Sequence, residues 1–229
     1  MIAIIILKLF IIVLVGYILG SIPFGLLLTR QIAKVDIRNY GSGKIGTTNV
    51  LRTAGKKAAT LSFMLDFTKG ALAVLFAALI FGRNYLVVGN FGLGLLVAQC
   101  LAALAAIAGH NWSIFLGFRG GRGVATFFGG LAALSPVVAL FGGQVFAIGI
   151  GMTRFASLGS IAGVVGTYTI LIPLTILDGF PVEYLVYCLI GTIIVIYMHR
   201  DNIARLLAGK ERKLGEAARS TESSTAEKK

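Results

Sequence analysis

The apolar segment at residues 2–28, IAIIILKLFIIVLVGYILGSIPFGLLL, decides the fold class of this chain. An α-helix needs about 20 predominantly apolar residues to cross the hydrocarbon core of a bilayer, and this segment is longer than that. A cleaved signal peptide would carry a basic region before a shorter apolar run, whereas the first cation here is Lys8, inside the run. We therefore expect residues 2–28 to form the first membrane-spanning helix.

Composition extends this conclusion to the whole chain. Of the 229 residues, 57% are hydrophobic and 13% are charged, which is about half the charged fraction of a soluble domain. Further apolar runs cover residues 57–82, 91–109, 124–135, 137–152, 156–176 and 182–198. We predict an all-α, polytopic membrane protein with about seven transmembrane helices in one domain, residues 1–215. The polar tail at 216–229 is expected to be disordered.

Charge gives the sidedness. Seven Lys and Arg lie within residues 29–57 and eight follow Met198, whereas the loop 177–183 has none and carries two acids. Basic loops stay in the cytoplasm, so the acidic loop should lie outside. The chain must then enter and return within 124–155, through two short crossings broken at Ser135-Pro136 or through a re-entrant hairpin, rather than through one long crossing. This predicts an outer N-terminus and a cytoplasmic C-terminus.

The sidedness brings three polar stretches, 38–57, 110–123 and 199–215, to one cytoplasmic face. The net charge of +12 then reflects this bias and an attraction to anionic lipid headgroups, so no nucleic-acid partner is expected. Cys100 and Cys188 lie inside apolar runs and resemble packed side chains rather than a disulfide framework. The two histidines are far apart and no carboxylates cluster near them, so no metal site is predicted.

The polar stretch YGSGKIGTTNVLR, residues 40–52, contains the spacing G-x-G-x-x-G at Gly41, Gly43 and Gly46. A dinucleotide fingerprint needs a preceding strand and a following acidic residue, but a membrane helix and a basic linker precede this one, and Asp66 lies in an apolar run. What remains is a set of donors that suits an anion: glycine amides, the hydroxyl of Ser42 and side chains further along the stretch. A helix beginning near residue 47 would add its positive end. The alternative is a glycine-rich loop solvated among the headgroups.

A second stretch, GHNWSIFLGFRGGRGVAT at 109–126, again surrounds a cation, Arg122, with glycines just before an apolar helix. It could be a second anion loop, or a positive-inside anchor with Trp112 in the aromatic belt. A third stretch, YMHRDNIARLLAGKERKLG at 197–215, places His199 and Asn202 on one helical face. His199 is either a proton carrier at an anion site or an ordinary interfacial residue. Glu211 is expected to form an ion pair with its cationic sequence neighbours.

Two features lie inside the apolar runs. Asp66 and Lys69 are three residues apart on the second long helix, and charges within a membrane normally pair, which we expect for Asp66. Lys69, one turn further on, could instead reach an anion. Ser157 and Ser160 lie at the start of a later helix, where helix initiation or close packing is favoured over a direct role.

Taken in order, these stretches resemble the bacterial acyl-phosphate:glycerol-3-phosphate acyltransferases. That family shows Ser-Gly-Asn-Pro-Gly-x-Thr-Asn followed by Arg, then Gly-Gly-Lys-Gly-Val-Ala-Thr, then His-x-x-Asn-Ile-x-Arg-Leu with Gly-x-Glu after it. The corresponding segments here are SGKIGTTNVLR, GGRGVAT and HRDNIARLLAGKE. The sequence departs from the family at Lys44-Ile45, which replace Asn-Pro, and at Arg119 and Arg122, which replace lysines.

The resemblance implies an integral enzyme of the bacterial inner (cytoplasmic) membrane that performs the first step of phospholipid synthesis without a cofactor. Its substrates would be a fatty acyl phosphate and glycerol 3-phosphate, and its oligomeric state is left open. Catalytic roles fall to Ser42, Arg52, His199 and Asn202. Substrate binding falls to Gly43, Gly46, Asn49, Lys69, Gly120, Gly121, Arg122, Gly123, Ser160 and Arg205. The base would be His199 or a substrate phosphate.

Two other classes fit the sequence less well. Acyltransferases with a His-x-x-x-x-Asp motif do not fit, because neither histidine has an aspartate five positions on. A transporter or channel for a phosphorylated solute would use the same anion loops without chemistry. Such a protein places polar groups near the midplane, whereas the polar stretches here gather at one face.

Overall fold

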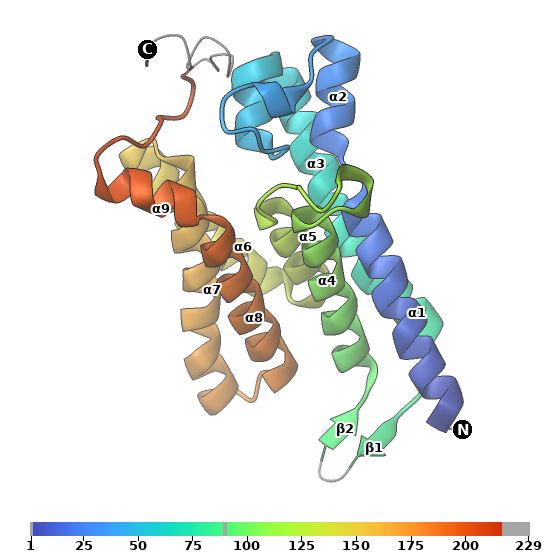
Figure 1. Ribbon diagram of the computed structural model, residues 1–229. Helices are drawn as coiled ribbons and strands as arrows, with labels where there is room; N and C mark the ends of the chain where they lie inside the picture. The colour runs from blue at the N-terminus through green and yellow to red at the C-terminus, as the bar shows by residue number, and fades with distance from the viewer. Residues whose placement is uncertain (1, 89–90, 217–229) are drawn as a thin grey trace.

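The computed structural model describes residues 2–88 and 91–216, and most of the predicted tail at 216–229 lies outside the described residues. The chain is a bundle of long helices, as predicted (Figure 1). Its helices are α1 (Ile2–Ser21), α2 (Phe24–Ile32), α3 (Thr47–Phe81), α4 (Leu95–Asn111), α5 (Val124–Leu134), α6 (Pro136–Thr153), α7 (Ala156–Leu177), α8 (Val182–Met198) and α9 (Arg200–Leu207). Single 3-10 turns occupy Ile37–Asn39 (η1) and Ile114–Leu116 (η2).

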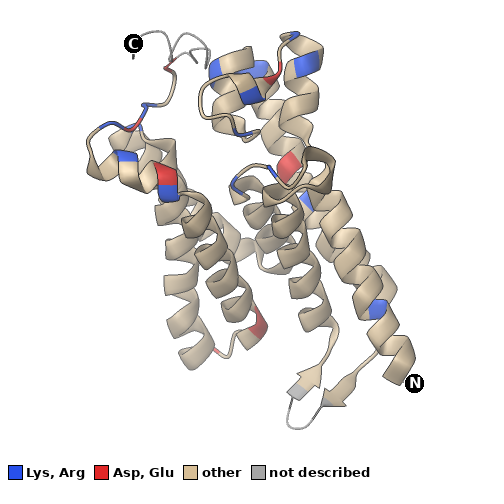
Figure 2. Ribbon diagram, in the orientation of Figure 1, with Lys and Arg blue, Asp and Glu red and all other residues tan. Residues whose placement is uncertain are grey.

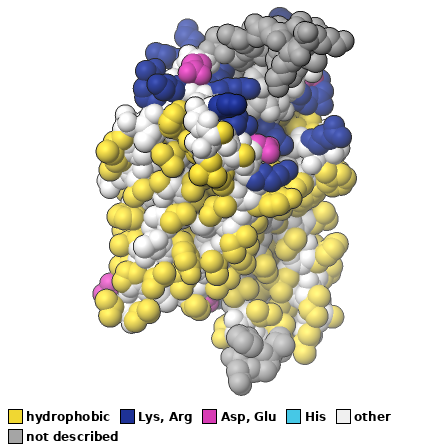
Figure 3. Space-filling model, turned by 60° about the vertical axis from the view of Figure 1, so that its left-hand side comes forward, with side chains coloured by type: hydrophobic (Ala, Val, Ile, Leu, Met, Phe, Trp, Pro, Cys, Tyr) yellow, Lys and Arg dark blue, Asp and Glu magenta, His cyan; other side chains and the backbone are white. Residues whose placement is uncertain are grey.

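Length and composition identify the membrane-crossing helices. Among the described residues, five helical segments are long and apolar enough to span a bilayer: α1 with α2, α3, α4, α6 and α7. A sixth is α8, which continues into α9 across a bend of 61°. Large apolar side chains remain exposed along these helices, including Leu79 and Met152, and they form a broad belt on the space-filling surface (Figure 3). Such a belt is suited to lipid.

The predicted break at Ser135-Pro136 is present, because α5 ends at Leu134 and Pro136 takes the first turn of α6. The two helices form a hairpin, with α5 leaving the end of the bundle that carries α9 and α6 returning to it. The 11 residues of α5 reach about 16 Å, well short of a hydrocarbon core of about 30 Å. The lengths therefore favour a hairpin over one long crossing, and seven complete crossings remain a prediction.

The expected span 91–109 begins too early. Residues Phe91–Leu93 (β2) pair with Leu86–Val88 (β1) in a short antiparallel hairpin, with Val87 opposite Gly92, and α4 begins only at Leu95. Hydropathy cannot separate a short apolar strand from a helix start. The glycines at 92 and 94 indicated that the helix starts later, since glycine weakens a helix interior.

Close backbone approach holds the helices together. A Cβ at Gly20 in α1 would overlap the carbonyl of Ala106 in α4, and one at Gly129 in α5 would overlap that of Phe67 in α3. In the main core, the Phe127 and Tyr187 rings stack at 5.3 Å, and the Tyr187 hydroxyl donates to the Phe127 carbonyl at 2.8 Å. Small residues at helix contacts are typical of packing within membranes.

Charge separates the two ends of the bundle. Lysine and arginine gather at the end that carries α2, α9 and the loop before α5, whereas the α7–α8 loop with its two acids lies at the opposite end (Figure 2). The start of α1 also lies at that opposite end. The three polar stretches 38–57, 110–123 and 199–215 therefore share one end, as predicted.

Candidate active site

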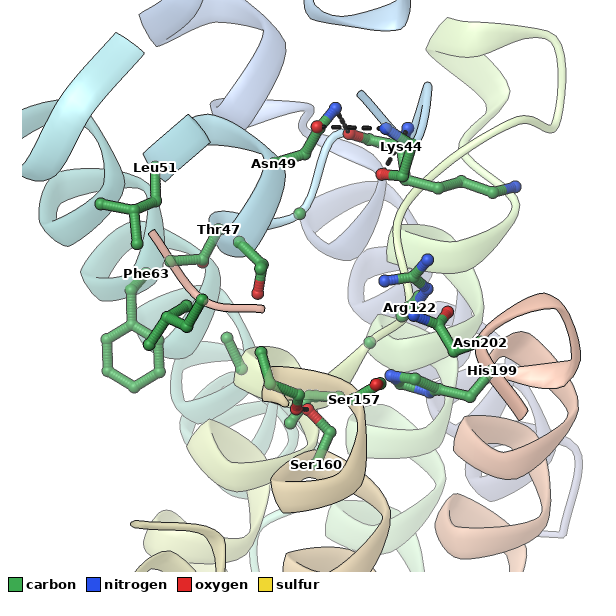
Figure 4. Close-up of a pocket in the computed structure, with 18 of the residues that line it drawn as sticks. Lys44, Thr47, Asn49, Leu51, Phe63, Arg122, Ser157, Ser160, His199 and Asn202 are labelled. Atoms are coloured by element: carbon green, nitrogen blue, oxygen red, sulfur yellow. Dashed lines mark hydrogen bonds between the residues drawn. The ribbon is translucent and has the colours of Figure 1, made fainter. Parts of the chain in front are cut away.

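A cavity of about 260 Å³ opens at the cationic end of the bundle (Figure 4). Its wall comes from the start of α3, the start of α5, the end of α6, the start of α7 and the junction of α8 with α9. Polar and charged side chains form one part of this wall, and Leu51, Phe63, Phe146 and Ile150 form an apolar part. The cavity thus joins an ionic region to a hydrocarbon-like region.

Asn49 shapes the first loop. Its side chain is 2% exposed, and its Nδ2 donates to the carbonyls of Tyr40 and Lys44 at 3.0 and 2.9 Å. Its Oδ1 accepts from the Ser42 amide at 3.2 Å. The Gly43 amide donates to Tyr40, so this part of the loop is held by its own bonds and its amides do not form the free nest that the sequence suggested.

Free donors occur one step further along, where α3 begins at Thr47 as predicted. Gly46, Thr47 and Thr48 all line the cavity, and the first amides of a helix have no partner within it. The α3 backbone turns sharply at Gly55, which has φ 80°. The eight residues before this kink therefore form a separate short helix whose N-terminus faces the cavity.

The second loop departs from the prediction in a similar way. The Gly120 amide donates to the Asn111 carbonyl and the Gly121 amide to the His110 carbonyl, both at 3.0 Å. These two glycines lie outside the cavity wall and let the loop pack tightly on the end of α4, so they are not anion donors. Gly123, in the left-handed region at φ 79°, turns the chain into α5 and does line the cavity.

Three helix N-termini face this cavity. Thr47 begins α3, Val124 begins α5 and Ala156 begins α7, and all three residues belong to the wall. Ser157 also lines it, while the Ser160 hydroxyl, in the same wall, donates to the Ala156 carbonyl at 2.7 Å. Helix N-termini attract anions through free amides and the helix dipole. Their convergence makes this end of the cavity suited to multiply charged anions.

Arg122 supplies a cation without a counter-ion. Across residues 2–88 and 91–216, no hydrogen-bond or ion-pair partner reaches its guanidinium, and its Nε is buried. Burial, together with the charge of Arg205, lowers the pKa of Arg122 to about 10, so it stays charged at neutral pH. Burial and then the charge of Arg122 also lower the pKa of Lys44, another residue of the wall. An unpaired guanidinium suits a phosphate oxygen.

His199 lies directly after α8, where the chain bends into α9, and is 1% exposed. Its Nδ1 is 2.8 Å from the Val195 carbonyl, which can only accept, so Nδ1 carries the proton and Nε2 is the acceptor. Burial and the charge of Arg122 lower the pKa of His199 to about 4. The imidazole is therefore neutral near pH 7 and presents a free nitrogen to the cavity.

Glu211 is an ion-pair partner, as expected, but its cation is Arg205 rather than an adjacent residue, and it joins α9 to α7. Its carboxylate accepts from Asn202 Nδ2 at 2.6 Å, from Arg205 Nε at 2.8 Å and from the Ser157 hydroxyl at 2.9 Å. The carboxylate is 5% exposed, whereas its sequence neighbours Lys210 and Arg212 point outward and are exposed. Asn202 Oδ1 is buried beside the cavity and has no hydrogen-bond partner among the described residues.

Arg52 contributes in two ways. Its Nη2 donates to the carbonyls of Arg212 and Lys213 at 3.1 and 3.2 Å, which fastens the segment after α9 to α3. Its Nε is buried and has no hydrogen-bond partner in the part of the chain that the structure describes, and the side chain lines the cavity. The Leu214 amide donates to the Arg154 carbonyl at 2.7 Å and closes the same segment over the site.

The intramembrane charges pair as predicted. Lys69 Nζ lies 2.6 Å from Asp66 Oδ1, with both side chains at most 3% exposed, and Lys69 also donates to the Ile22 carbonyl at 3.0 Å. Lys69 consequently turns away from the cavity. Asp66 itself lines the cavity, as does His110, whose Nδ1 lies 3.4 Å from Asp66 Oδ1.

The structure brings most of the predicted site residues together. Those that line the cavity are Ser42, Gly46, Asn49, Arg52, Arg122, Gly123, Ser160, His199 and Asn202. Those outside its wall are Gly43, Lys69, Gly120, Gly121 and Arg205. The sequence interpretation gave no site role to Lys44, Asp66, Ser157, Glu211 or His110, which all line it. The available signal for Asp66 was its place in an apolar run, where an ionisable residue suggests function.

Fold and cavity together define the class: a polytopic helical membrane protein with a cationic cavity, rimmed by helix N-termini, at one end. Comparison with known proteins gives the family. The sequence profile described as glycerol-3-phosphate acyltransferase matches residues 10–209, and the chain belongs to this family. The resemblance drawn from the motifs is thereby confirmed.

Relatives and solved structures agree with this assignment. The chain is 61% identical over 212 residues to glycerol-3-phosphate acyltransferase 3 of Dehalococcoides mccartyi (strain CBDB1), covering 93% of this chain and 98% of that protein. It is 43% identical to the enzyme of Clostridioides difficile (strain 630), covering 90% and 95%. The crystal structure of PlsY (YgiH), an integral membrane glycerol 3-phosphate acyltransferase in its glycerol 3-phosphate form, superposes with a TM-score of 0.77 at 37% identity, covering 90% and 96%.

Proposed function

We propose that this protein transfers a fatty acyl group from an acyl phosphate to the sn-1 hydroxyl of glycerol 3-phosphate, giving lysophosphatidic acid and inorganic phosphate. The observation that carries the proposal is Arg122, a guanidinium with no partner among residues 2–88 and 91–216, in a cavity where the N-termini of α3, α5 and α7 meet. Both proposed substrates bear phosphate, so the site must hold two anions close together. Each helix N-terminus can bind an anion, so the three termini and the guanidinium offer donors to both.

The apolar part of the wall supports a lipid donor. Leu51 and Phe63 of α3 lie in the same cavity wall as Phe146 and Ile150 of α6, and a fatty acyl chain can lie against these side chains while its phosphate stays at the ionic part. Solved relatives have been described in a glycerol 3-phosphate form and a lysophosphatidic acid form. Lysophosphatidic acid carries both a phosphate and a fatty acyl chain, which match the ionic and the apolar part of the wall.

The chemistry needs no covalent enzyme intermediate, because an acyl phosphate is already activated. The acceptor hydroxyl oxygen attacks the carbonyl carbon, the new ester C–O bond forms, and the bond from that carbon to the phosphate oxygen breaks. Phosphate leaves with the electron pair. The hydroxyl proton passes to the free Nε2 of His199 or to a substrate phosphate. Orientation and stabilisation of negative charge, by Arg122 and the helix amides, provide the catalysis.

We further propose that the cavity faces the cytoplasm of a bacterial cell, in the inner membrane. Lysine and arginine gather at the cavity end (Figure 2), whereas residues 177–183 at the other end carry Asp178 and Glu183 and no Lys or Arg, as the positive-inside rule expects. A single cysteine placed at Asp178, in the α7–α8 loop, should react with a membrane-impermeant thiol reagent from outside intact cells once Cys100 and Cys188 are replaced. Labelling only after the cells are opened would reverse this orientation.

The experiment that tests the function compares donors. Purified protein in detergent receives glycerol 3-phosphate with either palmitoyl phosphate or palmitoyl-CoA, and lysophosphatidic acid is measured. Product from palmitoyl phosphate alone is the expected result. Product from palmitoyl-CoA alone would contradict the proposed donor. No product from either, together with glycerol 3-phosphate flux in liposomes, would instead support a transporter.

A further inference from the structure

Arg122 lies on the loop before α5, and this loop packs against the end of α4. The Gly120 and Gly121 amides donate to the Asn111 and His110 carbonyls. A Cβ at Gly121 would overlap His110 Nε2, so the loop backbone rests directly on the imidazole. Asn111, next to His110, is 1% exposed and packs beside Gly123. The loop that carries the guanidinium is therefore in direct contact with the His110 ring.

His110 in turn is held by a buried charge. Its side chain is 4% exposed and its Nδ1 lies 3.4 Å from Asp66 Oδ1. Asp66 pairs with Lys69 at 2.6 Å, and Lys69 donates to the Ile22 carbonyl where α1 breaks into α2. A chain of contacts thus runs from the α1–α2 break through α3 and α4 to the loop that carries Arg122.

We propose that Asp66 and His110 are positioning residues that set the location of Arg122 in the cavity. They cross-link α3 to the end of α4, and the imidazole provides the surface on which Gly120 and Gly121 rest. His110 Nε2 lies against the Gly121 backbone and Nδ1 faces Asp66, so the ring connects the loop to α3. Buried ionic groups are costly even when paired, and ionisable residues inside a membrane commonly mark function; positioning of the loop would be the function of this pair.

The first test measures the position of Arg122 without reference to any reaction. Phenylglyoxal modifies accessible guanidinium groups, and mass spectrometry gives the rate at each arginine. We expect His110→Ala to raise the rate at Arg122 several-fold and to leave exposed Arg119 of the same loop unchanged. An unchanged rate at Arg122 would overturn the proposal.

Val74→Ala is the matched control for lost packing. Val74 is fully buried on the same helix as Asp66 but belongs to the main core, so its truncation should lower the melting temperature without altering the labelling of Arg122. An equal rise in both variants would mean general loosening, and would contradict a specific role of His110.

Gly121→Ala disrupts the same contact by a change in the loop. It provides a second test if His110→Ala does not fold. It should also raise labelling at Arg122, because the new Cβ displaces the loop from the imidazole. In the double variant the clash is absent, so labelling should match that of His110→Ala alone. If the increases in the labelling rate multiplied in the double variant, or if Gly121→Ala left the rate unchanged, a shared contact would be refuted.

A second readout rests on the proposed function. His110→Ala should lower kcat/KM for acyl transfer by about 10-fold to 100-fold, and restoring a polar side chain with His110→Gln should recover part of it. Unchanged kcat/KM with raised labelling would overturn the link between Arg122 position and catalysis. An inactive wild-type protein would refute the proposed function, while the labelling result would still decide the positioning.

Discussion

The ring of His199 donates its Nδ1 proton to the Val195 carbonyl, one turn earlier in α8, at 2.8 Å. This bond leaves Nε2 as an acceptor in the cavity beside Arg122. Burial and the Arg122 charge both favour the neutral ring, and together they lower the pKa of His199 to about 4. The geometry therefore supplies a neutral imidazole at the pH where the cell works.

A histidine NMR titration checks this state, because the chain has only two histidines. Removing the neighbouring positive charge with Arg122→Gln should raise the pKa of His199, since that charge disfavours the imidazolium. The folded pKa lies below the unfolded value of about 6.5. Folding stability from this group is therefore complete above about pH 6.5 and is lost as the pH falls towards 4. A His199 pKa that stays near 6.5 in the native protein would contradict the burial of the ring.

Arg122 should respond differently to loss of charge and to change of shape. Arg122→Ala should lower kcat/KM by about 100-fold, or about 2.7 kcal/mol, because one charge-assisted contact to phosphate is lost. Arg122→Lys should stay within about 10-fold of wild type, since a point charge still binds phosphate without the fork geometry. Arg119→Ala, on the exposed side of the same loop, should change little. A large loss at Arg119 with none at Arg122 would reverse their roles.

Alanine substitutions at Gly46 and Gly43 test two different effects: Gly46→Ala tests anion binding, and Gly43→Ala tests backbone strain in the loop. Gly46 has φ −72° and open space where a Cβ would lie, so Gly46→Ala should leave the melting temperature unchanged. It should nevertheless raise KM, because the new methyl group stands where a phosphate would approach the Thr47 and Thr48 amides. Gly43 has φ 67°, so Gly43→Ala should lower stability by about 1 kcal/mol. An unchanged KM in Gly46→Ala would argue against anion binding at this helix N-terminus.

We expect substitution of Glu211 to lower the stability of the fold. Glu211→Gln removes the charge that pairs with Arg205 and weakens the bonds from Asn202 and Ser157. We expect a loss of about 1–3 kcal/mol in unfolding free energy, because the carboxylate is buried. Glu216→Gln makes the same change of charge at an exposed position, so its melting temperature should match wild type. Equal melting temperatures for both variants would mean that the Glu211 network contributes no stability.

The helices were predictable because the features that determine them lie in short stretches of the sequence. Apolar length set the spans, the charge on either side set which polar stretches share an end, and Pro136 marked the break between α5 and α6. The Asp66–Lys69 pair also followed from a spacing of three residues in an apolar helix. The short hairpin before α4 did not follow, because its few apolar residues fit a strand or a helix equally well.

Within the site, the sequence indicated which loops matter but not which atoms are free. Gly120 and Gly121 looked like anion donors, yet their amides bind carbonyls at the end of α4, nine residues or more earlier in the chain. Glu211 is the ion-pair partner that the sequence indicated, but its cation is Arg205, and it also accepts from Ser157 of α7, a contact across 54 residues. Such long-range partners are set by helix packing, which spacing along one chain does not report.

The most direct test of acyl transfer in this cavity is the stoichiometry of products from purified protein given palmitoyl phosphate and glycerol 3-phosphate. Wild type should release inorganic phosphate and lysophosphatidic acid in equal amounts, and Arg122→Ala, with an unchanged melting temperature, should lose both in parallel. Phosphate release without lysophosphatidic acid, or full turnover in Arg122→Ala, would contradict transfer at this site.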